Sequence, residues 1–391
     1  MARPSLLCLV ACFASLTFAQ NAAPNSPAAT ASSTPVQVVY VIDGTSLLTY
    51  NVDPQTLNAT QVGTPITVGG LTGYGVLIPS PNDHFVYFVA PNAQGVDHLW
   101  VYVTDASGVP QAPAIQVMTV KGFWGMQLDP LSNFAYLVIK SSSDNSNYQA
   151  TYSLKRYTVD SVSGSLSQPL VEATYLLFDD PSGADCGLEL FGFNPAATTL
   201  YDAVICNNHD NNTGTYYERT LNSQTGALGP DVQIYSWNSG YEGVQFVHNL
   251  MFDFVTPNNF QQGIDYVNID PVKPNTKPVV HCTANMLEAC GYAGGFVHPS
   301  GKYLFMAITQ DTAQIERVEL GQHKIVDTGN YIPYQFGRFS PDGSLVYAIL
   351  NQTSGYLLEI YGFNATTSAV RPGGAIYVPS GFDSYFAAER Y

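Results

Sequence analysis

The chain has 391 residues, of which 46% are hydrophobic and 11% are charged, so it is long enough to bury a large core. Its 14 basic and 30 acidic residues give a formal net charge of -16 at pH 7. This acidic surplus repels nucleic acid and anionic membrane surfaces, and neither is expected as a partner. No segment after the N-terminal region approaches the length of a transmembrane helix, so we predict none. We expect a monomer that binds a small molecule, a glycan or a protein.

The N-terminal segment predicts export. Arg3 precedes an apolar run from Leu6 to Phe18, and small residues follow the run at a suitable cleavage site. An alternative is a lipid anchor on Cys12, because the residues that end there resemble the cleavage box of bacterial lipoproteins. We therefore predict a signal peptide over residues 1–19, a disordered leader rich in Ala, Ser, Pro and Asn over 20–35, and a secreted or periplasmic protein.

A proline followed six residues later by an aromatic residue recurs along the rest of the chain. Seven copies at a period of roughly 40 to 65 residues are typical of a propeller with one blade per repeat. Within each copy the proline opens a tight turn and the aromatic residue lies on the returning strand. The pairs are Pro81/Tyr87, Pro130/Tyr136, Pro195/Tyr201, Pro299/Phe305, Pro341/Tyr347 and Pro379/Tyr385, with His248/Phe254 as a degenerate copy.

A second hairpin follows the first in most repeats, as in Asp160 to Gly164 and Asn222 to Gly226, which gives four strands per repeat. Unmatched strands at Val38–Ile42 and Leu47–Val52 can pair with two strands left over in the last repeat. We therefore predict an all-β fold over residues 36–391. It is a seven-bladed β-propeller of four-stranded antiparallel blades, the last closed by N- and C-terminal strands.

Four cysteines remain after the signal peptide, and an even number in an exported chain favours disulfides. We predict the pairs Cys186–Cys206 and Cys282–Cys290, with unpaired buried cysteines as the alternative. No Cys-x-x-Cys motif indicates zinc, and we predict no metal ligands and no cofactor. The oxygen-rich loop from Asn207 to Asn212 makes a divalent cation such as calcium possible, although its spacing fits a polar turn better.

Long insertions fall on one face of the predicted propeller, where the links between blades and the loops between second and third strands collect. The opposite face has mostly tight turns. Binding residues are usually built on loops that a rigid scaffold positions, so we expect the site on this looped face. The insertions cover Lys140 to Ala150, Asp179 to Gly187, Cys206 to Gly214, Ser236 to Glu242 and Cys282 to Tyr292.

The repeat seen at Phe339 to Tyr347, together with the hairpin at Tyr157 to Gly164, resembles those of the seven-bladed lactonase-like propellers. These include 6-phosphogluconolactonase-type enzymes and YVTN repeat proteins. The resemblance implies an Arg-His pair shortly before the Phe-x-Pro turn of the inner strands, but no repeat of this chain has that pair. The inner strands supply one arginine, Arg338, so the catalytic set of the family cannot be transferred.

Other side chains occupy the expected channel mouth. Glu189 and Glu242 lie at equivalent distances before their turns on consecutive blades, which makes them candidate catalytic carboxylates. Both can instead be structural, and the nearby aromatic residues can be packing between blades. The candidate ligand-binding residues are Tyr74, Trp124, Tyr241, Tyr292, Tyr334, Gln335 and Arg338.

Two functions follow from these patterns. We favour an exported propeller that binds a glycan, small molecule or protein without the usual lactonase residues. The alternative is a hydrolase of lactones or sugar derivatives that uses Glu189 and Glu242, with Gln335 and Tyr241 positioning the substrate. Whether the protein is an enzyme stays open at this point.

Overall fold

The computed structural model describes most of the chain after the predicted leader. The described residues form strands and turns, and none of them belongs to a helix long and apolar enough to cross a membrane. They are residues 37–68, 75–92, 94–141, 148–179, 185–194, 196–207, 213–238, 240–247, 250–256, 263–268, 295–309, 312–319, 324–333, 336–352, 355–378 and 385–390.

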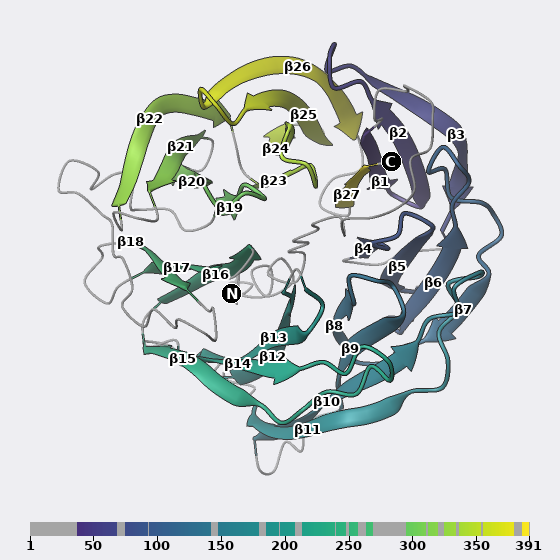
Figure 1. The fold of residues 1–391 in the computed structure, drawn as a ribbon. Helices are drawn as coiled ribbons and strands as arrows, with labels where there is room; N and C mark the ends of the chain where they lie inside the picture. The colour runs from purple at the N-terminus through teal and green to yellow at the C-terminus, as the bar shows by residue number, and fades with distance from the viewer. Residues whose placement is uncertain are drawn as a thin grey trace, which may run out of the picture.

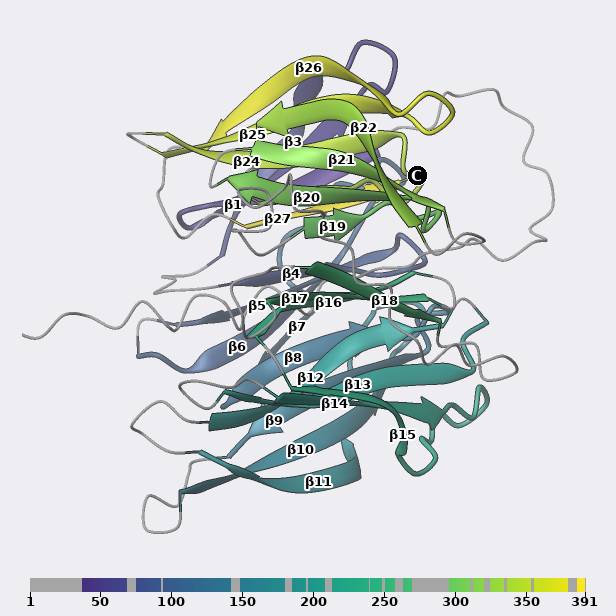
Figure 2. The same ribbon diagram turned by 90° about the vertical axis from the view of Figure 1, so that its left-hand side faces the viewer.

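The described strands form seven antiparallel sheets, six with four strands and one with three, arranged around a common centre (Figure 1). Seen from the side, the sheets stand with their strands roughly parallel to one another (Figure 2). The first four in chain order are β27(Tyr385–Arg390)-β1(Gln37–Asp43)-β2(Ser46–Val52)-β3(Ala59–Thr67), β4(Val76–Pro79)-β5(Phe85–Pro91)-β6(Asp97–Val103)-β7(Gln116–Thr119), β8(Phe123–Leu128)-β9(Phe134–Lys140)-β10(Gln149–Thr158)-β11(Leu170–Phe178) and β12(Asp185–Phe193)-β13(Thr199–Asn207)-β14(Thr213–Thr220)-β15(Val232–Asn238).

The remaining three sheets have the same order, with the first strand nearest the centre and the last at the rim (Figure 1). They are β16(Gly240–Val247)-β17(Leu250–Thr256)-β18(Gly263–Asn268), β19(Gly295–Val297)-β20(Tyr303–Thr309)-β21(Thr312–Glu319)-β22(Lys324–Pro333) and β23(Phe336–Phe339)-β24(Leu345–Gln352)-β25(Gly355–Asn364)-β26(Ala369–Val378).

The two ends of the chain meet in one sheet, because β27 pairs antiparallel with β1. The expectation that the last repeat supplies two strands to this sheet is wrong. Residues 369–378 form β26, which pairs with β25 and completes the preceding sheet. The C-terminal segment therefore supplies one strand and the N-terminal segment three. The pair Pro379/Tyr385 spans the link between two sheets and does not mark a turn within one.

The residue before the repeat proline holds the turn between the first and second strands. Asp129 Oδ1 accepts a hydrogen bond from the Phe134 backbone N–H at 2.6 Å, and Ser340 Oγ accepts one from Leu345 at 3.0 Å. Ser80 does the same for Phe85 at 2.9 Å. Short polar side chains favour such turns because they satisfy backbone donors that have no partner in the sheet.

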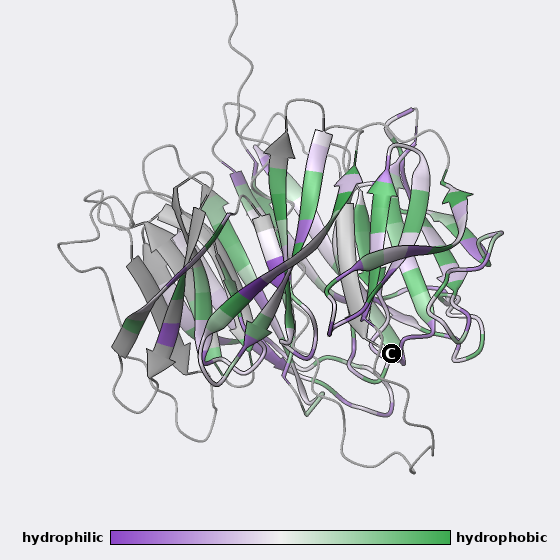
Figure 3. Ribbon diagram, turned by 90° about the horizontal axis from the view of Figure 1, so that it is seen from above, coloured by the Kyte–Doolittle hydropathy of each residue, from purple (hydrophilic) through white to green (hydrophobic). Residues whose placement is uncertain are grey.

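The core lies between neighbouring sheets, and inner strands such as β5 are buried on both faces because each sheet packs against a neighbour on either side. Tyr87, Val101 and Leu137 belong to one buried cluster between the β4–β7 and β8–β11 sheets. Apolar stretches follow the strands and polar residues gather in the turns, as Figure 3 shows. Each described sheet is thus stabilised mainly through its neighbours.

The repeat tyrosine ties each of three sheets to the next. The Tyr136 hydroxyl donates a hydrogen bond of 2.6 Å to the backbone carbonyl of Gly226, in the outer hairpin turn of the following sheet. Gly226 has a φ of +70°, and a Cβ there would lie 2.5 Å from the Phe134 ring, so only glycine fits. The same bond joins Tyr40 to Gly108 and Tyr87 to Gly164, both at 2.8 Å. We call these bonds the tyrosine latches.

Replacing Tyr136 with phenylalanine is expected to lower the free energy of unfolding by about 1–2 kcal/mol, because the buried Gly226 carbonyl loses its donor. Tyr152→Phe is a matched control in the same sheet, since Tyr152 is also fully buried but its hydroxyl has no hydrogen-bond partner among the described residues. Urea unfolding of both variants measures the difference. Equal losses in the two would show that the latch contributes nothing.

Candidate functional site

The structure describes the side chains of five predicted site residues, namely Trp124, Glu189, Arg338 and the cysteines Cys186 and Cys206. Tyr241 and Glu242 lie on β16, an innermost strand like β12, but their side chains are outside the described residues, so their convergence with Glu189 stays a prediction. The other predicted residues that fall outside the described ranges are Tyr74, Tyr292, Tyr334, Gln335, Cys282 and Cys290.

Trp124, Glu189 and Glu242 lie at the same distance before the proline position of their repeats, but their strand pairing differs. Trp124 and Glu242 each fall at a register shift, between Phe123 and Gly125 in β8 and between Tyr241 and Gly243 in β16. Glu189 pairs regularly with Ala203, and the shift in β12 comes after it. A bulge re-aims the side chain at its extra residue. Glu189 therefore has a different backbone setting from the other two.

Glu189 is a buried carboxyl group without a hydrogen-bond or ionic partner among the described residues. Its residue is 7% exposed, and within the described part of the chain it makes no hydrogen bond or ion pair. Burial raises the pKa of the Glu189 carboxyl to about 8, because the charged form loses its hydration. A carboxyl group with a pKa close to neutral can both accept and donate a proton at physiological pH.

Trp124 lies beside the side of β12 from which Glu189 projects. A Cβ added to Gly187 would lie 2.9 Å from the Trp124 indole, so the ring rests against this glycine. Asp185, Gly187 and Glu189 are alternate residues of one strand and therefore project to the same side. The indole thus contacts β12 at Gly187, which leaves the room that the ring needs.

Lys140 and Tyr152 extend this site on the neighbouring sheet. The Lys140 Nζ atom is 3.0 Å from Asp179 Oδ1, 5.3 Å from the centre of the Trp124 ring and 5.6 Å from that of Tyr152. The Tyr152 ring meets Trp124 edge to face at 5.4 Å. Desolvation raises the pKa of Tyr152, and the nearby charges of Asp179, Asp185 and Glu189 raise it further.

We call these side chains the Trp124 platform. Sequence reasoning found Trp124 and Glu189 but missed the contribution of the neighbouring strand ends. Lys140 ends β9 and Asp179 follows β11, and both strand ends reach the looped face on either side of β10. The sequence did point to these two residues, because two of the predicted insertions begin at Lys140 and Asp179. The platform consists of Trp124, Lys140, Tyr152, Asp179, Asp185 and Glu189.

Arg338 is not part of this platform. It lies half-buried on β23, where it pairs with Tyr347, and β23 belongs to a different sheet. Within the described residues, no group of three or more His, Cys, Asp or Glu side chains is arranged to hold a metal ion. Residues 208–212 of the predicted oxygen-rich loop lie outside the described ranges.

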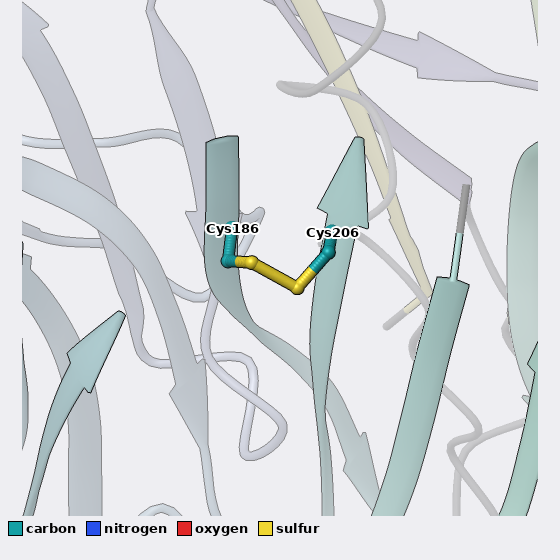
Figure 4. Close-up of a disulfide and its surroundings, with 2 residues drawn as sticks. All are labelled: Cys186 and Cys206. Carbon is teal, nitrogen blue, oxygen red and sulfur yellow. A yellow bond between two sulfur atoms is a disulfide. The ribbon is translucent and has the colours of Figure 1, made fainter. Parts of the chain in front are cut away.

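The predicted disulfide between Cys186 and Cys206 is confirmed (Figure 4). The two residues face each other in the β12–β13 pair, with their Cα atoms 3.9 Å apart. The bond therefore joins two neighbouring strands of one sheet. Because Cys186 precedes Glu189 on β12, the disulfide fixes the strand that carries the candidate carboxyl group.

Replacing both cysteines with serine is expected to lower the free energy of unfolding by about 3 kcal/mol, because the disulfide closes a loop with a sequence separation of 20 residues. Denaturant unfolding of the oxidised protein and of the double variant measures this loss. A reduced wild-type sample should match the variant. A variant as stable as the oxidised wild type would mean that the bond adds no stability.

The comparisons with known proteins identify the fold. No family model and no curated protein matches the sequence. Among solved structures, a candidate 6-phosphogluconolactonase from Bacteroides uniformis has a TM-score of 0.61 and 14% identity, with 90% of this chain and 99% of that chain covered. A second one, from Bacteroides fragilis, has a TM-score of 0.61 and 12% identity, covering 92% and 100% of the two chains.

A third structure is a periplasmic gluconolactonase from Pseudomonas aeruginosa. It has a TM-score of 0.60 and 14% identity, and the match covers 90% of this chain and 99% of that chain. Such identities establish a shared architecture and leave the chemistry of each site to be argued from its own residues. The chain therefore has the fold of the 6-phosphogluconolactonase-like propeller proteins.

Proposed function

We propose that the protein hydrolyses the internal ester of a sugar lactone at the Trp124 platform. The observation that carries this proposal is Glu189, a buried carboxyl group with no described partner and a pKa raised to about 8 by burial. Burying such a group destabilises a protein, and groups of this kind cluster at functional sites. The shared fold with proteins named as lactonases supports hydrolysis over binding without turnover.

The reaction needs one proton acceptor that later becomes a proton donor. The ionised Glu189 takes a proton from water while the water oxygen attacks the lactone carbonyl carbon. The tetrahedral intermediate then collapses, the bond between the carbonyl carbon and the ring oxygen breaks, and Glu189 returns the proton to that oxygen. The product is an open-chain hydroxy acid. A pKa near the working pH suits both transfers.

Trp124 supplies the binding surface in this proposal. An indole ring packs well against the C–H groups of a sugar ring, and the neighbouring carboxyl groups of Asp185 and Glu189 accept hydrogen bonds from sugar hydroxyls. The fully buried Tyr152 ring packs edge to face against the indole and supports it. We also propose that Glu242 takes part in catalysis and that Tyr241 and Gln335 position the substrate.

Ring opening of D-glucono-1,5-lactone, followed by acid release in a lightly buffered pH-indicator assay, tests the function. The wild type is expected to exceed the spontaneous rate, and Glu189→Gln to lose at least a hundredfold in kcat. Because Glu189 must be ionised, kcat/KM should rise with pH and level off above about 8. Turnover by Glu189→Gln at the wild-type rate would refute the assignment, and binding without turnover would favour the noncatalytic function.

We further propose that the seven sheets are the blades of one closed propeller, with β27 completing the sheet of β1 to β3. The pairing of β1 with β27 and the buried cluster that Val39 and Val41 share with Tyr347 of the β23–β26 sheet support closure. An extracellular or periplasmic location is also proposed. The disulfide supports it, because such bonds persist in oxidising compartments.

A further inference from the structure

The positive charge of the Trp124 platform is on Lys140, and an ion pair with Asp179 neutralises it. Lys140 is the one cation with a described contact to the Trp124 and Tyr152 rings, and its ammonium group is 3.0 Å from Asp179. The Lys140 and Asp179 side chains are only 23% and 15% exposed, so solvent screens their attraction less than on an open surface. The ion pair leaves the platform without a free cation of its own.

Other charges near the ring are negative. Asp185 and Glu189 project from the same side of β12 as the glycine on which the indole rests. Lys121 lies exposed in the link before β8 and has no ion pair or ring contact with the platform within the described residues. A phosphate group bound at the platform would lie near the carboxyl groups of Asp185 and Glu189. Among the described platform residues, no unpaired cation would offset its charge.

We propose, on the basis of the proposed lactone hydrolysis, that the site takes an uncharged sugar lactone and that Asp179 disfavours a phosphorylated one. Asp179 does this by holding Lys140 in an ion pair, because a phosphate needs a free Lys or Arg to offset its loss of hydration. A bound dianion would also oppose ionisation of Glu189, which the reaction requires. Asp179 is therefore a specificity-determining residue that makes no covalent contribution.

The test compares D-glucono-1,5-lactone with its 6-phosphate as substrates of the full mature chain. The wild type is expected to have at least a tenfold higher kcat/KM for the uncharged lactone. Asp179→Asn frees Lys140, and the preference should fall by about tenfold. Asp160→Asn is the matched control, because it removes the same charge from an exposed turn between β10 and β11 of the same sheet. This control should keep the wild-type preference.

Two results would overturn the proposal. One is a wild type that prefers the phosphorylated lactone, and the other is Asp179→Asn with an unchanged preference and an intact fold by thermal unfolding. If neither lactone is opened, the proposed hydrolysis fails, and calorimetric binding of D-glucose against glucose 6-phosphate still measures the selectivity. Selective binding of glucose that weakens in Asp179→Asn would support the role of Asp179, whereas binding of neither sugar would refute the platform as a ligand site.

Discussion

Replacing Glu189 with glutamine is expected to stabilise the protein above pH 8 by up to about 5 kcal/mol, while kcat of the proposed hydrolysis falls at least a hundredfold. The pKa of the buried carboxyl is about 8, against an ordinary value of 4.5. At about 1.4 kcal/mol for each pH unit, this difference sets the upper limit. A glutamine of nearly the same shape has no charge to desolvate.

The sign of the effect follows from proton binding. Below pH 4.5 both the folded and the unfolded protein hold the Glu189 proton. The wild type and Glu189→Gln then have nearly the same free energy of unfolding. Between pH 4.5 and about 8 the unfolded chain releases the proton while the folded chain keeps it, so the stability of the wild type falls as pH rises. Above about pH 8 the loss is complete and constant.

Thermal unfolding of the wild type and Glu189→Gln between pH 5 and pH 9 measures this divergence. Their melting temperatures should be close at pH 5 and separate steadily up to about pH 8. Asp105→Asn is a useful control, because it removes one carboxyl charge from an exposed turn. Curves that stay parallel over the whole range would show that the Glu189 carboxyl does not resist ionisation.

Replacing Asp202 with asparagine is expected to lower the free energy of unfolding by about 3–5 kcal/mol, because it removes the close partner of the buried Arg219 charge and leaves only a more distant one. Asp202 Oδ2 is 2.5 Å from Arg219 Nε, and the two side chains are 0% and 4% exposed. Asp231, at 3.6 Å from the Arg219 Nη2 atom, is a weaker second partner. The Tyr175 ring of the neighbouring sheet lies 5.6 Å from the guanidinium group.

A double variant separates loss of the pair from loss of one charge. Asp202→Leu combined with Arg219→Met removes both charges, and we expect it to be at least 2 kcal/mol more stable than Asp202→Asn, since a buried ion pair contributes little beyond its own desolvation. Chemical denaturation of the three proteins provides the comparison. A double variant less stable than the single one would mean that the pair is a net source of stability.

Much of the fold could be predicted because local turn chemistry repeats. Proline turns and Asp-to-Gly hairpins mark most strand boundaries, and the hairpins at Asp160 and Asn222 are where the sequence placed them. The spacing of Pro379 and Tyr385 follows the same rule by coincidence, and it misled the assignment of the last strands. A repeat pattern cannot show whether a segment closes its own sheet or begins the next, because that depends on pairing with β1.

The candidate site was predictable only in part. A carboxylate and an indole on inner strands can be found by counting back from the turns, which identified Glu189 and Trp124. The contact between Lys140 and Asp179 joins residues 39 apart, and only the register of β10 with both of its neighbours brings them together. Bulges are equally invisible to spacing, so the backbone difference between Glu189 and Glu242 appears only in the pairing.

The shared sheet of the two chain ends has a consequence for biosynthesis. Strands β1 to β3 are made first, but their sheet lacks β27 until residues 385–390 emerge from the ribosome. Throughout synthesis the β1 edge offers unpaired backbone groups to other chains. If the chain is exported unfolded, as proposed above, this problem is postponed, because all the described strands then reach the far side of the membrane before the first sheet must be complete.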